Sequence, residues 1–271
     1  MRIGLLAASI ISLVTHTSAT AAPPPLLLPT APWNVEFADS MCLLSRTYGR
    51  DGAMSLLLKP NMLGNGMEII VARANSAIGR PERGKVAVAV DGQKLNFDAH
   101  YDAQSSAQAR LLRVMVPEDK TELEALRDTL LIDAGPRSRL LFSLGGIDRA
   151  FPVLASCVAQ LRAVHKVSDA DILALATPPK GSAVDLFTSD DFPSEALGRG
   201  RSGTIGVLLW VEANGRVSTC KVFESSATTT FEQATCEIVK RRGRFTAARD
   251  AAGHAVRAPT FTRIRWMPPD G

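Results

Sequence analysis

The sequence lacks the features that usually mark a metal site or a nucleic-acid-binding surface. It has four histidines and four cysteines, but no Cys-x-x-Cys pair and no histidine at ligand spacing from a cysteine, so a zinc site is not expected. No basic stripe with interleaved aromatic residues occurs in a chain of net charge +4, which argues against a nucleic-acid partner. Aromatic residues make up only 6% of the chain, so aliphatic residues must fill the core.

The patterns that resemble catalytic motifs lack the context that those motifs need. The glycine spacing of residues 198–203 matches a dinucleotide fingerprint, but it is expected after a short helix and before a strand, the reverse of the functional order. Ser202 lacks the second spacer of a nucleophile elbow. His100 neighbours Asp98 and Asp102 without an obvious nucleophile. We therefore predict no catalytic residue, no metal and no cofactor, and we expect that the protein is not an enzyme.

The N-terminus has the pattern of a secretory signal peptide. Met1-Arg2 supplies one positive charge, residues 3–14 are mostly apolar, and Ala19-Thr20-Ala21 forms a small-residue cleavage site. The apolar run is shorter than the roughly 20 residues that a membrane span needs. We expect a signal peptide over residues 1–21, a mature protein in the periplasm, and no stable membrane span after cleavage. Residues 22–32 are proline-rich and are expected to form a stiff linker.

Residues 33–162 are predicted to form a β-rich domain. Alternation of apolar and polar residues indicates strands, separated by Gly, Pro, Asn and Asp. The expected strands cover residues 33–37, 54–58, 68–72, 85–90, 111–116 and 140–142. Helical spacing of leucines predicts helices over residues 118–131 and 147–161. A change in composition places a linker over residues 163–190, before a second domain over residues 191–271.

The second domain carries the clearest pattern. A short helix with Pro193 near its first turn precedes a strand over residues 204–211, whose alternation points four apolar side chains inward. Asn214-Gly215 predicts a hairpin to a returning strand over residues 217–224. A helix over residues 230–242 and a strand over residues 260–266 complete an α-β-β-α-β order. The expected fold class is therefore α+β, with a β-rich first domain followed by a small two-layer domain.

The four cysteines are expected to form two disulfides, since an exported chain with an even count favours pairing. Cys220 shares a strand face with Val222, and Cys236 lies on the helix that should cover that sheet. We therefore predict a Cys220–Cys236 disulfide. A Cys42–Cys157 disulfide would tie the start of the first domain to its last helix.

A series of short motifs in residues 190–267 resembles the TonB C-terminal domain family. The motifs are Phe192-Pro193-x-x-Ala196, Gly203-Thr204-Ile205-Gly206-Val207, Asn214-Gly215-Arg216-Val217, Arg241-Arg242-x-Arg244-Phe245-x-x-Ala248 and a closing Arg263-Ile264-Arg265-Trp266. The resemblance implies a module that binds an envelope protein or peptide by pairing with an added strand. It implies partner-binding roles for the last strand, with Phe192 and Pro193 in the flanking segment. The residues of that strand are Thr260, Phe261, Thr262, Arg263, Ile264, Arg265 and Trp266.

Three hypotheses about function follow from these observations. The first is a periplasmic protein-interaction protein with a link to TonB-type transport across the outer membrane, and with homodimerisation by sheet extension as a further expectation. The second is a ligand-binding protein or enzyme with its site in residues 33–162, in a pocket lined by His100, Asp98, Arg110 and Arg113. The third is a membrane-anchored energy transducer, which requires that the N-terminal segment is retained.

Overall fold

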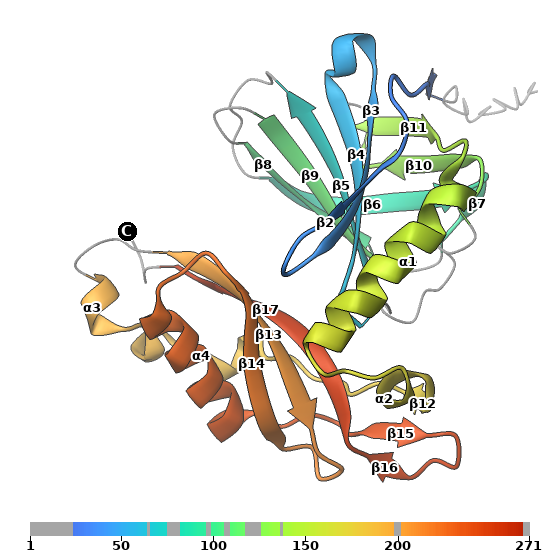
Figure 1. Cartoon of the computed structure of the whole chain (residues 1–271). Helices are drawn as coiled ribbons and strands as arrows, with labels where there is room; N and C mark the ends of the chain where they lie inside the picture. The colour runs from blue at the N-terminus through green and yellow to red at the C-terminus, as the bar shows by residue number, and fades with distance from the viewer. Residues whose placement is uncertain are drawn as a thin grey trace, which may run out of the picture.

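The computed structural model describes residues 24–63, 66–74, 82–95, 99–105, 109–116, 126–135, 138–197 and 202–267. The expected signal peptide and the glycine pattern at residues 198–201 lie outside the described residues. The chain folds into two bodies with different architecture, which lie one above the other in Figure 1. We call the body formed by β1–β11 and α1 domain one, and the body formed by β12–β17, α3 and α4 domain two. The mixed helix and strand content confirms the α+β class.

Domain one is a curved, mostly antiparallel sheet. Its strands follow in the order β1 (Leu26–Leu27), β11 (Arg139–Ser143), β10 (Thr129–Asp133), β6 (Glu82–Val90), β8 (Ala99–Ser105), β9 (Ala109–Val116), β5 (Met67–Ala74), β4 (Met54–Pro60), β3 (Cys42–Tyr48) and β2 (Asn34–Phe37), with β7 (Gln93–Lys94) beside β6. Pro29 forms a bridge to Tyr48, and the Thr30 N–H donates to the Thr47 carbonyl. Because β1 also pairs with β11, this contact closes the sheet on itself.

Alternation along the strands fills the interior of domain one with aliphatic side chains. Fully buried examples are Leu44, Leu56, Leu58, Ile69, Val114, Leu130 and Ile132. The Tyr48 hydroxyl donates to the Ser143 carbonyl across the closure at 2.9 Å. Burial raises the pKa of Tyr48 to about 12, although Arg46 opposes the shift. The interior is therefore a packed core.

The prediction of a helix over residues 118–131 is wrong where the structure describes it. Residues 126–128 are not helical, and Thr129–Asp133 form β10, paired with β6 and β11. The leucine spacing that suggested a helix also fits a strand, since Leu130 and Ile132 alternate into the core.

Helix α1 (Ile147–Val164) packs across β2 and β3, and it runs without interruption through Pro152. The disulfide Cys42–Cys157 joins β3 to α1, with a Cα–Cα distance of 5.9 Å. Both sulfurs belong to buried residues. The pairing is the one predicted from the sequence.

The two segments expected as linkers contribute to the folded structure. The proline-rich segment supplies β1, which pairs with β11, and the bridge from Pro29 to Tyr48. Residues 163–190 contain α2 (Ala170–Leu173), β12 (Leu175–Thr177) and the short 3₁₀ turns η3 (Val184–Leu186) and η4 (Ser189–Asp191). β12 pairs with β15 (Ala248–Asp250), which in turn pairs with β16 (Ala255–Val256).

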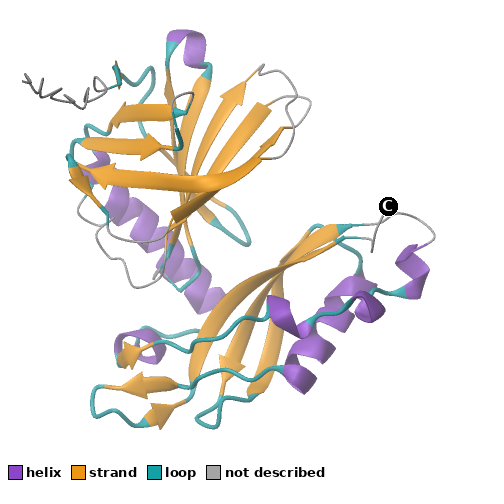
Figure 2. Ribbon diagram, turned by 180° about the vertical axis from the view of Figure 1, so that it is seen from behind, coloured by secondary structure: helices purple, strands orange, loops and turns teal. Residues whose placement is uncertain are grey.

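Domain two has the predicted α-β-β-α-β order. It consists of α3 (Ser194–Leu197), β13 (Gly203–Val211), β14 (Val217–Ser225), α4 (Thr229–Arg242) and β17 (Ala258–Trp266), with β13 between β14 and β17. Figure 2 shows α4 lying against one face of this sheet. The Asn214–Gly215 turn closes the β13–β14 hairpin, and Gly215 has a φ of 78°. A Cβ at this glycine would lie 2.1 Å from the Phe245 carbonyl oxygen.

Candidate protein-interaction edge

Strand β13 is buried on both faces. Its inward side chains Ile205, Val207, Leu209 and Val211 pack in the core beneath α4, as alternation predicted. The outward side chains of Leu208 and Trp210 belong instead to the apolar cluster of domain one. Domain one therefore covers the face of the sheet that α4 leaves open.

The domain joint has an apolar centre with a polar cluster beside it. We define the joint by Leu208, Trp210, Phe223 and Phe261 of domain two and by His165 and Lys59 of domain one. The Phe223 and Phe261 rings lie 4.8 Å apart, and the His165 ring meets Phe223 edge-on at 6.0 Å. Domain two thus rests on domain one through aromatic side chains from both of its edge strands.

Glu224 is the centre of the polar cluster. It accepts hydrogen bonds from Arg263 of β17, and the Lys59 ammonium of β4 lies 3.6 Å from its carboxylate. Burial would raise the pKa of Glu224, but Arg263 and then Lys59 outweigh this effect and hold it below its ordinary value. Burial and the charge of Arg263 lower the pKa of Lys59. The cluster links three strands across the joint.

The register of the sheet identifies which backbone groups β17 presents at its outer edge. Thr204 exchanges hydrogen bonds with Ser226, so its backbone faces β14. Alternation turns the next residue, Ile205, toward its β17 partner Ile264. The backbone of every second residue of β17 therefore faces away from the sheet. These residues are Phe261, Arg263 and Arg265, together with Pro259, which has no N–H.

The two edges of this sheet differ in regularity. β17 keeps one continuous register with β13 over nine residue pairs. The register of β14 shifts at two places, where Phe223 and Ser218 are the extra residues. Bulges of this kind are a common way to protect an edge from pairing with another chain. Of the two edges, β17 is the better template for an added strand.

Only part of the β17 edge is open. Ala258, Pro259 and Thr260 are buried, and α2 packs against the strand. Phe261, Thr262 and Arg263 are half-buried, and Arg265 is exposed. Within the described ranges, no strand pairs with the outer edge of β17. The open stretch therefore covers residues 261–266.

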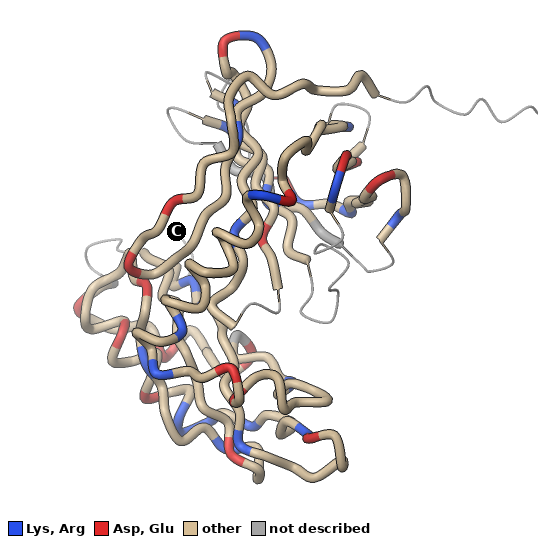
Figure 3. Tube along the Cα trace, turned by 45° about the vertical axis from the view of Figure 1, so that its right-hand side comes forward, with Lys and Arg blue, Asp and Glu red and all other residues tan. Residues whose placement is uncertain are grey.

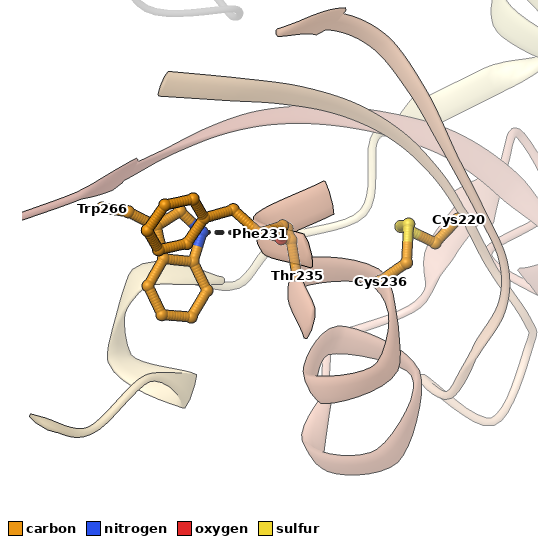
Figure 4. Close-up of a disulfide and its surroundings, with 5 residues drawn as sticks. All are labelled: Cys220, Phe231, Thr235, Cys236 and Trp266. Atoms are coloured by element: carbon orange, nitrogen blue, oxygen red, sulfur yellow. Dashed lines mark hydrogen bonds between the residues drawn. A yellow bond between two sulfur atoms is a disulfide. The ribbon is translucent and has the colours of Figure 1, made fainter. Parts of the chain in front are cut away.

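Several residues with an expected partner-binding role lie in the core of domain two. Phe192 packs edge-on against Phe231 and Trp266, with ring centroids 5.3 and 6.0 Å away. Trp266 is 5% exposed and Ile264 is 4% exposed. The Trp266 indole N–H donates to the Thr235 hydroxyl at 2.9 Å, as Figure 4 shows. These buried side chains therefore support β17 from the side of the sheet that α4 covers. Pro193, which follows Phe192 in the chain, is half-buried.

The disulfide Cys220–Cys236 fastens α4 to β14, with a Cα–Cα distance of 5.5 Å (Figure 4). The pairing agrees with the prediction. A second tie lies at the C-terminal end of α4, where Arg242 donates to Asp191 at 2.8 Å and to the Leu186 carbonyl at 2.9 Å. The hydrogen bond from Arg242 is the largest of several effects that lower the pKa of Asp191 to about 2. The disulfide therefore holds α4 on the sheet, and the ion pair holds its C-terminal end to the η3–η4 segment.

Of the four residues that would line a pocket under the second hypothesis, the structure describes the side chains of the two arginines, and each has a glutamate partner. Arg110 forms an ion pair with Glu82 at 2.9 Å, and Arg113 approaches Glu68 at 3.6 Å. The side chains of His100 and Asp98 lie outside the described residues. Among the residues that are described, no group of three His, Cys, Asp or Glu side chains could hold a metal ion. Figure 3 shows acidic and basic residues interspersed over both domains.

These features define a small α+β binding module with one regular open strand edge. Residues 189–268 match the model of the family described as Gram-negative bacterial TonB protein C-terminal, which is the family that this segment resembles in sequence. This family is a non-enzymatic protein-interaction domain. A search of curated proteins finds no match to the chain. None of the described helices is long and apolar enough to cross a membrane.

Sequence reasoning missed the cover that domain one provides for the sheet. The unbroken apolar run of residues 207–211 carried the signal. A strand that is apolar at every position is typically buried on both faces. No sequence signal indicated which backbone N–H groups of β17 face away from the sheet, because this depends on the pairing register with β13.

Proposed function

We propose that the protein is a periplasmic interaction protein whose β17 edge, over residues 261–266, pairs with an extended segment of another envelope protein. The observation that carries the proposal is the contrast between the regular β17 edge and the twice-bulged β14 edge. The family match supports a protein-interaction role in the Gram-negative envelope. A link to TonB-type transport across the outer membrane is the finer form of this proposal.

The position of β17 suits it to strand addition. The three backbone N–H groups of Phe261, Arg263 and Arg265 face away from β13, and an added strand would satisfy them. Contacts on both faces hold the strand in place, since Trp266 packs under α4 and Phe261 packs on domain one. An edge that is already ordered loses little conformational entropy when a partner binds.

A matched pair of substitutions at Arg265 tests the backbone role of this edge. Arg265→Pro removes one outward N–H at an edge position that tolerates proline, whereas Arg265→Ala keeps the N–H and removes only the side chain. We expect an envelope protein from periplasmic and outer-membrane extracts to bind the purified mature chain and the Arg265→Ala variant, but not Arg265→Pro. If Arg265→Pro retains every protein that the wild type retains, strand addition at β17 is wrong.

Thr262 provides the control for this experiment. Its N–H faces β13 in the pairing register, so Thr262→Pro should damage the sheet itself. We expect Thr262→Pro to lower thermal stability clearly more than Arg265→Pro.

Sedimentation equilibrium of the same variants tests a second copy as the partner, because dimerisation by this edge would also be lost in Arg265→Pro. N-terminal sequencing of the mature protein separates a cleaved signal, which gives a start at Ala22, from a retained anchor.

A further inference from the structure

His165 occupies an unusual position in the domain joint. It follows the last residue of α1, where its backbone N–H donates to the Leu161 carbonyl at 3.2 Å. The residue is 9% exposed, and its ring meets Phe223 of domain two edge-on. A histidine at this depth in an aromatic contact belongs to the interface and not to the solvated surface.

The hydrogen bonding of His165 favours a neutral ring. Its Nδ1 atom is buried and has no hydrogen-bond partner among the described residues. A neutral imidazole can keep its proton on Nε2 and leave Nδ1 as a bare acceptor. Protonation would add an N–H at Nδ1, and this donor would be buried without an acceptor. An unsatisfied buried donor that carries charge is costly.

The charges around the ring act in the same direction. Burial is the main effect that lowers the pKa of the imidazole from its ordinary value of 6.5, and the positive charge of Lys221 on β14 adds to it. At the end of α1, Arg162 donates a hydrogen bond to Asp169 at 2.6 Å. Lys166, the residue after His165, is another positively charged residue. Glu224, which is on the same strand as Phe223, is engaged by Arg263 and Lys59. None of these carboxylates bonds to the imidazole in the described structure.

We propose that the domain joint is a pH-sensitive contact, in which protonation of His165 loosens the packing of domain one on the outer face of the β14–β13–β17 sheet. The proposal goes beyond strand addition at β17, because it concerns how the two domains are held together. Protonation would place a second positive charge beside Lys221 in a contact built from Phe223, Phe261 and Trp210. Water could then enter the joint and hydrate the new N–H.

The direction of the pH dependence follows from linkage. The docked state holds the neutral ring, so it binds fewer protons than the separated state. Docking is therefore strongest above pH 6.5, which corresponds to the ordinary pKa of histidine. It weakens as the pH falls from 6.5 toward the lowered pKa of the docked ring. Each unit by which docking lowers this pKa corresponds to about a tenfold loss in the docking constant on full protonation.

Hydrogen exchange of the full mature chain tests the proposal. The protection of peptides from the end of α1 and from β14 is compared at about pH 7.5 and about pH 5, after correction for the intrinsic pH dependence of exchange. We expect the wild type to lose protection in both segments at the lower pH, while the core of domain one stays protected. His165→Gln cannot titrate and should keep the same protection at both pH values.

Two further measurements keep the proposal falsifiable. His254 is exposed on the β15–β16 turn, so His254→Gln is a matched control that should behave like the wild type. The chain has four histidines, so NMR titration can assign the His165 resonance by its absence in His165→Gln. Wild-type protection that is unchanged at low pH, an equal loss in His165→Gln, or a His165 pKa at or above its ordinary value would overturn the proposal.

Discussion

The two domains differ in how the edges and faces of their sheets are covered. Domain one closes its sheet on itself through Pro29 and Tyr48, and it buries its disulfide in its own core. Domain two has three long strands, and its two outer strands pair with no further strand in the described part of the chain. A helix covers one face of this sheet, and domain one covers the other. The disulfide of domain two is half-buried at the contact between α4 and β14. A closed body thus covers an open one, and the open one carries the edge that we propose for binding.

The largest expected difference between the domains concerns their disulfides. Cys42–Cys157 closes a separation of 115 residues, whereas Cys220–Cys236 closes 16. In the chain-entropy model, replacing both cysteines with alanine should cost about 5 kcal/mol for the first pair and about 3 kcal/mol for the second. The measurement is the free energy of unfolding of each domain, from hydrogen exchange of its core peptides. Equal losses would show that loop length does not control the contribution of these disulfides.

The elements that sequence predicted well are those specified by local patterns. The inward set of β13 follows from alternation, the hairpin follows from Asn214-Gly215, and α4 follows from helical spacing over residues 230–242. Each of these signals lies within one element and its turn. The same holds for β2, β4, β5, β6, β9 and β11 of domain one, whereas β3 and β8 were not predicted.

Two of the elements that sequence missed, β10 and the proline-rich segment, depend on contacts between distant segments. β10 was mistaken for a helix, because its leucines fit either period and only pairing with β6 and β11 decides between them. The proline-rich segment joined the sheet through a parallel pair with β11, 115 residues along the chain from Leu26 to Leu141. For the candidate edge, the resemblance identified the strand. Only the pairing register shows that the backbone N–H of Arg265 faces away from β13 and that the backbone N–H of Thr262 faces toward it.

A buried hydrogen bond in each domain gives a smaller comparison. The Trp266 indole donates to Thr235 in domain two, and the Tyr48 hydroxyl donates to Ser143 in domain one, each at 2.9 Å. Thr235→Val leaves a buried N–H without an acceptor and should cost about 2 kcal/mol. Tyr48→Phe removes the donor instead and should cost about 1 kcal/mol. Urea denaturation of each variant checks the order.

Thr235→Ser is the control for this pair, because it keeps the hydroxyl that both accepts from Trp266 and donates to the Phe231 carbonyl. We expect it to recover most of the stability that Thr235→Val loses. If Thr235→Ser is as unstable as Thr235→Val, the packing of the methyl group that serine lacks contributes as much at this position as the hydroxyl and its hydrogen bonds.

The smallest expected effect is an acid response confined to domain two. The Arg242 hydrogen bond and the bonds from Thr188 hold the pKa of Asp191 at about 2, below its ordinary value of 3.8. The folded state therefore keeps the carboxylate charged when the unfolded state begins to bind a proton. The stabilisation is fully present above pH 3.8 and is lost as the pH falls through about 2. We expect about 1 kcal/mol, since solvent screens part of the interaction.

Asp191→Asn tests this assignment, because an amide keeps an oxygen acceptor for Arg242 but cannot titrate. The difference in unfolding free energy between wild type and Asp191→Asn, measured from neutral pH down to about pH 2, should shrink in that acid interval. Domain one should show no such change on this substitution, since Asp191 and Arg242 join η4 to α4 within domain two. A difference that stays constant with pH would mean that the Asp191–Arg242 ion pair does not contribute to the acid sensitivity of the open domain.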